Sequence, residues 1–149
     1  MAEEVSENVL VEPDAIFRGI SFPFRRGTDE IPKAATDDEL IADTIAQLIL
    51  TSPGERIMRP ELGSAATTFI FETNEDALAS LIRTTIANTL GSFEQRIIVN
   101  SIDVEQANSA KTDTQNKDSV IITVSYVVPA TQQENSVSIQ VGTNQGLAP

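Results

Sequence analysis

The sequence predicts an α+β fold, in which two main helices pack on one face of a small, mostly antiparallel sheet. Two segments, 36–50 and 73–91, repeat apolar residues at helical spacing. Three later segments, 97–105, 120–128 and 137–141, are rich in β-branched residues and read as strands. Because these strands follow one another along the chain, we expect sequential strands to be neighbours in the sheet.

Composition excludes several classes of protein. The chain has 149 residues and is 40% apolar, which suits one domain with a core of its own. Its net charge of −12 disfavours nucleic acid and anionic membrane surfaces as direct partners. It has no Cys and no His, so disulfides, thiolate metal sites and the commonest general base are absent. We therefore expect no cofactor and no metal.

The charge and the aromatic residues suggest three regions along the chain. Residues 1–16 are predicted to be an acidic flexible arm, 17–142 the folded domain, and 143–149 a flexible tail. The arm is acidic where a signal peptide would be basic, and no apolar run approaches the roughly 20 residues of a membrane helix. The domain opens with "FRGISFPFRRG", where Phe22 and Phe24 are expected to be core residues, or else a hook onto a neighbouring protein.

Both helices carry signals at their ends. Thr36 is a suitable N-cap for the first helix, and Glu39 would complete a capping box with it. The Ser52-Pro53-Gly54 sequence ends that helix. For the second helix, Gly91 is expected to adopt the left-handed conformation that ends helices. Each helix has one apolar face, formed by Ile41, Ile45, Leu48 and Ile49 in the first and by Leu78, Leu81, Ile82, Ile86 and Leu90 in the second.

The strand segments differ in their patterns. Residues 120–128 alternate cleanly, with every second side chain apolar. In the last strand Val137, Ile139 and Val141 face one side and polar residues face the other. This strand is expected to lie at an edge of the sheet. Segment 65–72, "AATTFIFE", fits either a helical turn or a short strand.

The segment "PGERIMRPELGS", 53–64, combines two Arg and two Glu with Pro and Gly. Glu55 and Glu61 could act as the acid and base of a glycoside hydrolase. However, Arg56 and Arg59 lie between them and would lower a carboxyl pKa, which is wrong for a general acid. A short extended piece is expected at 55–58. Three interpretations remain: an active site, ion pairs within the fold, or a surface that holds another protein.

A second charged cluster lies in "FEQRI", 93–97. Glu94 and Arg96 are two residues apart at the expected start of a strand, so they would share one face. They could form a local ion pair or contact a partner.

Four stretches in this order carry a resemblance: "LILTSPGERIMRPELGS", "FIFETNEDALASLIRTTIANTL", "FEQRI" and "SIDV". Together with "FRGISFPF" they resemble the phage baseplate wedge family, the T4-type gene product twenty-five-like proteins that include the type VI secretion subunit TssE. The resemblance covers residues 17–105 closely and the last two strands loosely. The Glu-Pro-Arg motif of the family falls on Glu94-Gln95-Arg96. Gln95 replaces the proline, which keeps both charges but restores a backbone N–H.

The resemblance implies a structural role in a contractile tail or injection particle. Such proteins bind the core bundle of the larger wedge subunits and start the sheath, with a C-terminal sheet like the handshake domain of sheath subunits. The implied partners are wedge subunits and sheath protein, with tube or hub proteins as further candidates, in sixfold copies and without nucleic acid or membrane. The particle would be a virion or a cytoplasmic injection particle, made in the host cytoplasm.

The expected binding residues form two groups. Glu94, Arg96, Arg56, Arg59 and Glu61 are expected to contact the wedge. Val137, Ile139 and Val141 are expected to receive an added strand from the sheath protein. The alternative function is a muralytic, lysozyme-like tail enzyme that uses Glu55 and Glu61.

Overall fold

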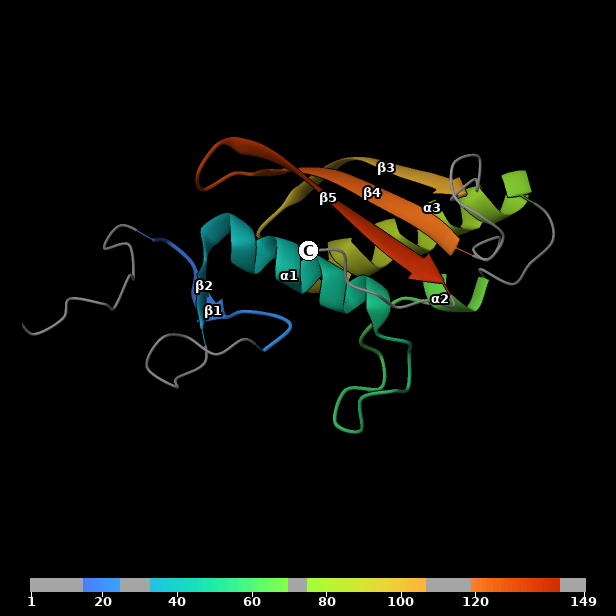
Figure 1. The fold of residues 1–149 in the computed structure, drawn as a ribbon, viewed down its shortest axis with the longest axis horizontal. Coiled ribbons are helices and arrows are strands. Elements are labelled where there is room, and N and C mark those ends of the chain that lie inside the picture. Colours follow the sequence, from blue (N-terminus) through green and yellow to red (C-terminus); the bar gives the residue numbers. More distant parts are fainter. Residues whose placement is uncertain (1–14, 25–32, 70–74, 107–118, 143–149) are drawn as a thin grey trace, which may run out of the picture. The chain divides into compact units, whose positions relative to one another are not determined.

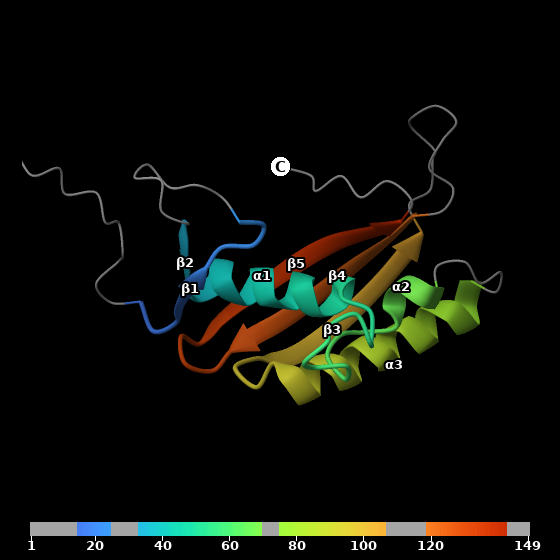
Figure 2. The same cartoon turned by 90° about the horizontal axis from the view of Figure 1, so that it is seen from below.

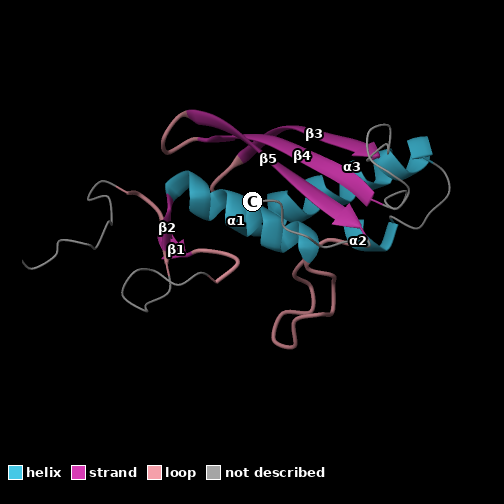
Figure 3. Cartoon of the chain, viewed as in Figure 1, coloured by secondary structure: helices cyan, strands magenta, loops and turns pink. Residues whose placement is uncertain are grey.

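The computed structural model describes residues 15–24, 33–69, 75–106 and 119–142. The chain divides into two compact units, Met1–Asp43 and Thr44–Pro149, and the boundary falls inside helix α1 (Asp37–Leu50). The helices and strands are labelled in Figure 1 and coloured by type in Figure 3. Most of the predicted N-terminal arm and the whole predicted C-terminal tail lie outside the described residues.

The first unit contains a two-stranded sheet that the sequence pattern did not predict. Strand β1 (Arg18–Ile20) pairs antiparallel with β2 (Ala34–Thr36), and Gly19 lies opposite Ala35. A Cβ at Gly19 would lie 2.5 Å from Leu40 Cδ1, so a larger residue here would require the Leu40 side chain to move. Three-residue strands are too short to produce a visible alternation.

The start of α1 differs from the predicted capping box. Thr36 is the last residue of β2, and Asp37 has a positive φ of 41°. Asp37 Oδ1 accepts hydrogen bonds from the backbone N–H groups of Ile16 (2.9 Å) and Phe17 (2.8 Å). Glu39 pairs instead with Lys33 Nζ at 2.7 Å. The acidic residues therefore tie the incoming chain to the helix start instead of capping the helix locally.

The two phenylalanines of the opening segment are not equivalent. Phe22 is half-buried, and its N–H donates to Asp43 Oδ2 at 2.8 Å. The Phe22–Pro23 peptide bond is cis. Phe24 is 78% exposed, so the expectation that it belongs to the core is wrong. Unlike Phe22, it has no described backbone contact that holds its segment against α1.

The second unit contains a three-stranded antiparallel sheet in the order β3-β4-β5, formed by β3 (Ile98–Gln106), β4 (Ser119–Val128) and β5 (Gln133–Gly142). Figure 1 shows these strands side by side, in chain order. The prediction that strands adjacent in the chain are neighbours in the sheet is confirmed. Strand β5 is longer than the predicted 137–141, because its first residues are polar and give no apolar signal. Strand β3 has a bulge between Val99 and Ser101.

The core of this unit lies on one face of the sheet. Strand β4 buries every second side chain, and α3 (Glu75–Phe93) and the part of α1 in this unit add their apolar stripes. Both helical segments lie on the same face of the sheet (Figure 2). The buried residues are Val120, Ile122, Val124, Tyr126 and Val128 of β4, Leu78, Ile82, Ile86 and Leu90 of α3, and Ile45, Leu48 and Ile49 of α1. The predicted α+β class is confirmed.

Three local predictions about the helices have clear outcomes. Leu81 is 46% exposed, because it lies at the margin of the stripe that Leu78 and Ile82 define. Gly91 does not end α3, which continues to Phe93. The ambiguous segment forms a helical turn, α2 (Ala66–Phe69), as far as it is described. In the described ranges, no helix has the length and hydropathy needed to cross a membrane.

Candidate partner-binding surfaces

The loop 51–64 between α1 and α2 is closed by its own backbone. The N–H of Ser64 donates to Thr51 O at 2.9 Å, and the N–H of Gly54 donates to Pro60 O at 2.8 Å. Inside the loop, the N–H of Arg59 donates to Arg56 O at 3.1 Å. The predicted extended piece at 55–58 is therefore wrong, because consecutive turns replace it.

The base of this loop is fixed to two helices. Thr89 Oγ1 of α3 donates to Gly63 O at 3.2 Å, and Ser64 Oγ donates to Ile49 O of α1 at 3.1 Å. Gly63 has φ 117°, and a Cβ there would lie 2.2 Å from Thr51 O. Only glycine fits this approach of two backbone segments. The loop is therefore held as a fixed projection.

The charged side chains of the loop point into solvent. Arg56, Arg59 and Glu61 are exposed, and none of them forms an ion pair with another described residue. Glu55 Oε2 accepts the N–H of Ser52 at 3.0 Å, which stiffens the first turn. Internal ion pairing, one interpretation of this segment, is not found within the described residues.

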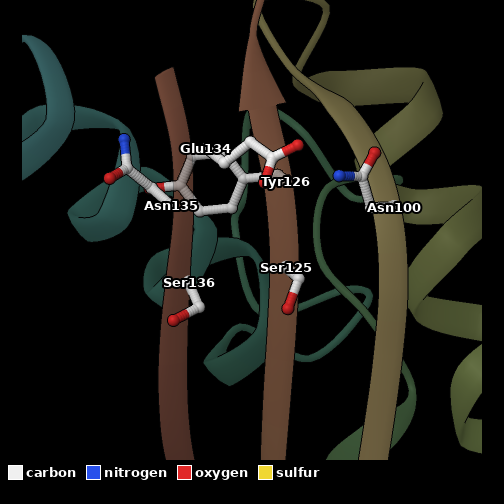
Figure 4. A pocket seen from close by; sticks show the side chains of 6 residues that line it. All are labelled: Asn100, Ser125, Tyr126, Glu134, Asn135 and Ser136. Atoms are coloured by element: carbon white, nitrogen blue, oxygen red, sulfur yellow. The ribbon is translucent and has the colours of Figure 1, made fainter.

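The carboxyl groups of the loop do not line the cavity that the described residues form on the sheet. A cavity of about 450 Å³ lies on the sheet. It is lined by Asn100, Ser125, Tyr126, Glu134, Asn135 and Ser136, whose side chains are labelled in Figure 4. Its lining holds one carboxyl group, whereas glycoside hydrolysis uses two that flank the scissile bond. Glu55 and Glu61 lie on the exposed loop and are not among the lining residues. This geometry does not support the muralytic alternative.

Glu94 and Arg96 form a largely internal ion pair in the turn before β3. Arg96 Nε donates to Glu94 Oε1 at 2.7 Å, and Arg96 Nη2 donates to Glu94 Oε2. The Glu94 side chain is 3% exposed and that of Arg96 is 30% exposed. The hydrogen bonding of Arg96 to the Glu94 carboxylate raises the pKa of Arg96 above its ordinary value; partial burial opposes this shift and the negative charge of Glu94 adds to it.

This ion pair connects three elements of the second unit. Arg96 Nη2 also donates to Thr44 Oγ1 of α1 at 3.3 Å, and the N–H of Glu94 donates to Leu90 O of α3 at 2.8 Å. The sequence pattern had placed the pair at the start of a strand. In the structure the pair lies before β3, which begins at Ile98. A contact of these two residues with a partner protein stays a prediction. Of the two side chains, only that of Arg96 is accessible enough to reach a partner.

The two edges of the three-stranded sheet are unlike. At the β3 edge, Arg83 Nε of α3 donates to Ile102 O at 3.0 Å, and the bulge interrupts the strand. At the other edge, β5 pairs with β4 and with no further strand among the described residues. Ile139 and Val141 are buried in the core of their own sheet and Val137 is half-buried. The surface that β5 offers at this edge is therefore its main chain.

Ile57 and Met58 are functional candidates that the sequence analysis did not single out. They are 96% and 91% exposed at the far end of the loop. Their signal in the sequence is an apolar pair between two Arg, inside a segment bounded by Pro and Gly. A turn of this length cannot fold back to bury them.

Comparison with known proteins agrees with this architecture. The family described as baseplate wedge protein gp25 matches residues 35–133. A presumed tail lysozyme from Geobacter sulfurreducens has a similar fold, with a TM-score of 0.62 and 23% identity over 74% of this chain and 94% of that one. A chain of the anti-feeding prophage baseplate is also similar, with a TM-score of 0.58 and 20% identity over 86% of each chain.

No curated protein sequence matches the chain. The resemblance drawn from the sequence motifs is confirmed by the family match, which spans more than half of the 149 residues. The chain therefore belongs to the baseplate wedge protein gp25 family.

Proposed function

We propose that the chain is a structural baseplate subunit that joins the core bundle of the larger wedge subunits to the first ring of sheath protein. In this proposal it starts sheath assembly by accepting a strand at β5. The observation that carries the proposal is the asymmetry of the sheet. Strand β3 is guarded by Arg83 and a bulge, whereas β5 pairs with β4 on one side and with no further strand among the described residues on the other. Membership of the baseplate wedge family supports the structural role.

Strand addition uses groups that an edge strand leaves unpaired. The outward N–H and C=O groups of β5 would bond to an extended segment of the sheath protein, and alternating side chains would set its register. Ser136, Ser138 and Gln140 form the exposed face of β5, while Ile139 and Val141 keep the strand fixed to the core. A rigid edge binds with less loss of entropy than one that must first become ordered.

The wedge contact is proposed to lie at the loop and at the ion pair beside β3. Arg56, Arg59 and Glu61 are exposed on a stiff projection, so they can pair with a partner while losing little conformational freedom. Glu94 and Arg96 would hold the scaffold that presents these groups, with Arg96 contributing its accessible side. The proposal includes sixfold copies, tube or hub proteins as further neighbours, and no catalytic step or cofactor.

Hydrogen exchange with the sheath protein tests the proposal. The amides of β5 that point away from β4 should exchange quickly in the isolated chain and become protected when sheath protein is added. Amides in β3 serve as the internal control and should keep their rates. Unchanged exchange across Gln133–Gly142 in a complex that does contain sheath protein would contradict strand addition.

A second measurement uses the absence of cysteine from the chain. A Ser138→Cys variant carries a single thiol on the exposed face of β5 and should form a disulfide with cysteines placed along the incoming strand, in one register only. This design avoids deleting residues 137–149, since that would remove the buried Ile139 and Val141 and unfold the sheet. Disulfides in many registers would argue against a defined added strand.

The muralytic alternative has a direct test, which the similarity in fold to a presumed tail lysozyme makes worthwhile. Purified chain is expected to leave a cell-wall gel uncleared in zymography. Clearing that disappears in Glu55→Gln or Glu61→Gln, with folding unchanged, would replace the structural proposal with an enzymatic one.

A further inference from the structure

We propose that Ile57 and Met58 form an apolar plug that inserts into an aliphatic pocket rimmed by carboxylates on a different baseplate protein. This inference rests on the proposed function of the chain as a baseplate subunit. It adds an anchoring pair to the charged residues of the loop and specifies the chemistry of the surface that receives them.

The exposure of this pair stands out among the described apolar residues. Ile57 is 96% exposed and Met58 is 91% exposed, while the next most exposed large apolar side chain, Phe24, reaches 78%. Single exposed apolar residues are ordinary on protein surfaces. Two adjacent ones, here called the apolar patch, are less ordinary, because both side chains lie almost fully in water on a loop that its own hydrogen bonds close.

The loop presents the patch in a fixed position. Backbone hydrogen bonds close it at Ser64–Thr51 and Gly54–Pro60, and Thr89 anchors Gly63 to α3. A disordered loop would lose conformational entropy on binding, whereas this one is already ordered. Nothing in the packing of the second unit requires these two side chains, since neither is buried against it. Their apolar character is therefore available for a partner.

The charges beside the patch indicate the chemistry of the partner. Arg56 and Arg59 directly flank the apolar pair, and neither forms an ion pair within the described residues. Arginine forms paired hydrogen bonds with carboxylates, and both Arg and Met are enriched at protein interfaces. An aliphatic pocket with Asp or Glu at its rim would satisfy all four side chains at once.

A second copy of this chain and a lipid surface fit less well. Each copy carries a net charge of −12, so copies repel one another and are repelled by anionic lipids. The cavity found among the described residues is lined by polar side chains, including Asn100, Asn135 and Glu134, and offers no aliphatic pocket. A different protein is therefore the expected occupant.

The binding test compares Ile57→Ser/Met58→Ser with two matched controls in full-length chain. Ile57→Val/Met58→Leu keeps the patch apolar, and Ile98→Ser removes an apolar side chain that is 59% exposed on the sheet. The double serine variant should fold normally but bind the wedge subassembly roughly 10- to 100-fold more weakly, because burial of each apolar side chain contributes on the order of a tenfold change in affinity. Both controls should bind within about threefold of wild type.

Three outcomes overturn the inference. If the double serine variant binds as tightly as wild type, the plug is wrong, although the chain would still be a baseplate subunit. If Ile98→Ser weakens binding equally, the patch has no special role. If the wild-type chain floats with anionic lipid vesicles and the double serine variant does not, the patch binds membrane. Failure of the wild-type chain to enter the baseplate at all would instead contradict the proposed function.

Photo-crosslinking identifies the pocket directly. A benzophenone amino acid at position 58 in assembled particles should crosslink to one other protein, on a peptide with aliphatic residues and nearby Asp or Glu. The same group at position 98 is the control and should give no such adduct. Adducts only between copies of this chain, or none from position 58 in particles that contain it, would contradict the plug.

Discussion

At the residue scale, the carboxylate of Glu94 accepts three hydrogen bonds from Arg96: one from its backbone N–H, one from Nε and one from Nη2. Because Glu94 is 3% exposed, this charge depends on Arg96 for nearly all of its solvation. The glutamine between them, Gln95, is exposed and leaves the pair intact. The pairing therefore does not need the proline that the family motif has at this position.

The ion pair should respond asymmetrically to substitution. Arg96→Met leaves a buried carboxylate without a partner and should lower the free energy of unfolding by about 3–5 kcal/mol. Glu94→Gln should cost clearly less, because the half-exposed Arg96 can turn to water and the amide oxygen still accepts one bond. Urea denaturation of the two variants measures the difference. Equal losses would show that the burial of Glu94 is not the source of the cost.

The effect of pH on Arg96 follows from the direction of its shift. Its pKa is raised, so its contribution to stability is complete below the ordinary arginine value and is lost only as pH rises beyond the raised one. Between pH 6 and pH 9 the stability gap between wild type and Glu94→Gln, a variant without a buried carboxyl that could take up a proton, should therefore stay constant within about 0.5 kcal/mol. Unfolding curves across this range check it, and a gap that shrinks steadily toward pH 9 would contradict it.

Two glycines of the loop, Gly54 and Gly63, can be compared with Gly91 of α3 as a control. Gly63→Ala should destabilise by more than about 2 kcal/mol, because φ is positive and the new Cβ would overlap Thr51 O. Gly54→Ala has the strained φ but open space, so about 1 kcal/mol is expected. Gly91→Ala lies inside α3 with nothing near its Cβ, and should stabilise by about 0.5–1 kcal/mol. Thermal unfolding ranks them, and any other order would contradict this reading.

At the scale of elements, the two edges of the three-stranded sheet differ within the described residues. Arg83 of α3 satisfies a carbonyl of β3, and the bulge beside Asn100 breaks the regular ladder. Natural sheets use both devices to prevent edge-to-edge pairing. Beyond β5 the described residues include no further strand, and the proposed strand addition uses this edge.

Removal of the guard should make the isolated chain associate. Arg83→Ser frees Ile102 O at the β3 edge and should produce concentration-dependent self-association by sedimentation velocity. The change also makes a chain of net charge −12 more negative, which opposes association, so any increase must come from the exposed edge. A variant as monomeric as wild type would indicate that the bulge alone protects β3.

The sequence was most informative where one face of an element is buried. The alternation of β4 and the stripe of α1 predicted their buried residues correctly, since burial repeats with the period of each element. Local signals were less reliable. Glu39 pairs with Lys33 instead of capping the helix, and Gly91 stays inside α3, because a local propensity worth about 1 kcal/mol does not by itself fix a helix end.

The candidate surfaces were only partly predictable. The sequence drew attention to the loop by its Arg, Glu, Pro and Gly residues, but it could not show whether Arg56 and Arg59 were paired. That depends on contacts between segments distant in the chain, such as Thr89 with Gly63. The same kind of contact assigns Glu94 to Arg96 and Arg96 to Thr44, which no local pattern specifies.

At the scale of the whole molecule, the charge sets how copies behave before assembly. With a net charge of −12 and a sequence pI near 4.2, isolated chains repel each other at neutral pH. In the proposed particle the copies must therefore be brought together by partners and not by mutual attraction. Arg56 and Arg59 of the loop are two of the ten basic residues that oppose this negative charge.

The purified chain should thus remain monomeric at pH 7 in low salt. Light scattering should show net repulsion that weakens as salt screens the charge, and association near pH 4 as the net charge approaches zero. A discrete ring of copies in low salt at neutral pH would contradict this expectation. It would place the contacts between copies within this chain alone.

In the proposed role, the sheet admits a new strand at β5 but not at β3, where Arg83 donates to Ile102 O. Such a sheet has a direction, as a growing filament has. A protein with such a sheet would serve as a seed from which a lattice extends in one direction, and it could not be inserted partway along that lattice. Its amount in a particle would then set how many lattices begin, whatever length they reach. Particles with longer tails should contain no more of it than particles with short ones.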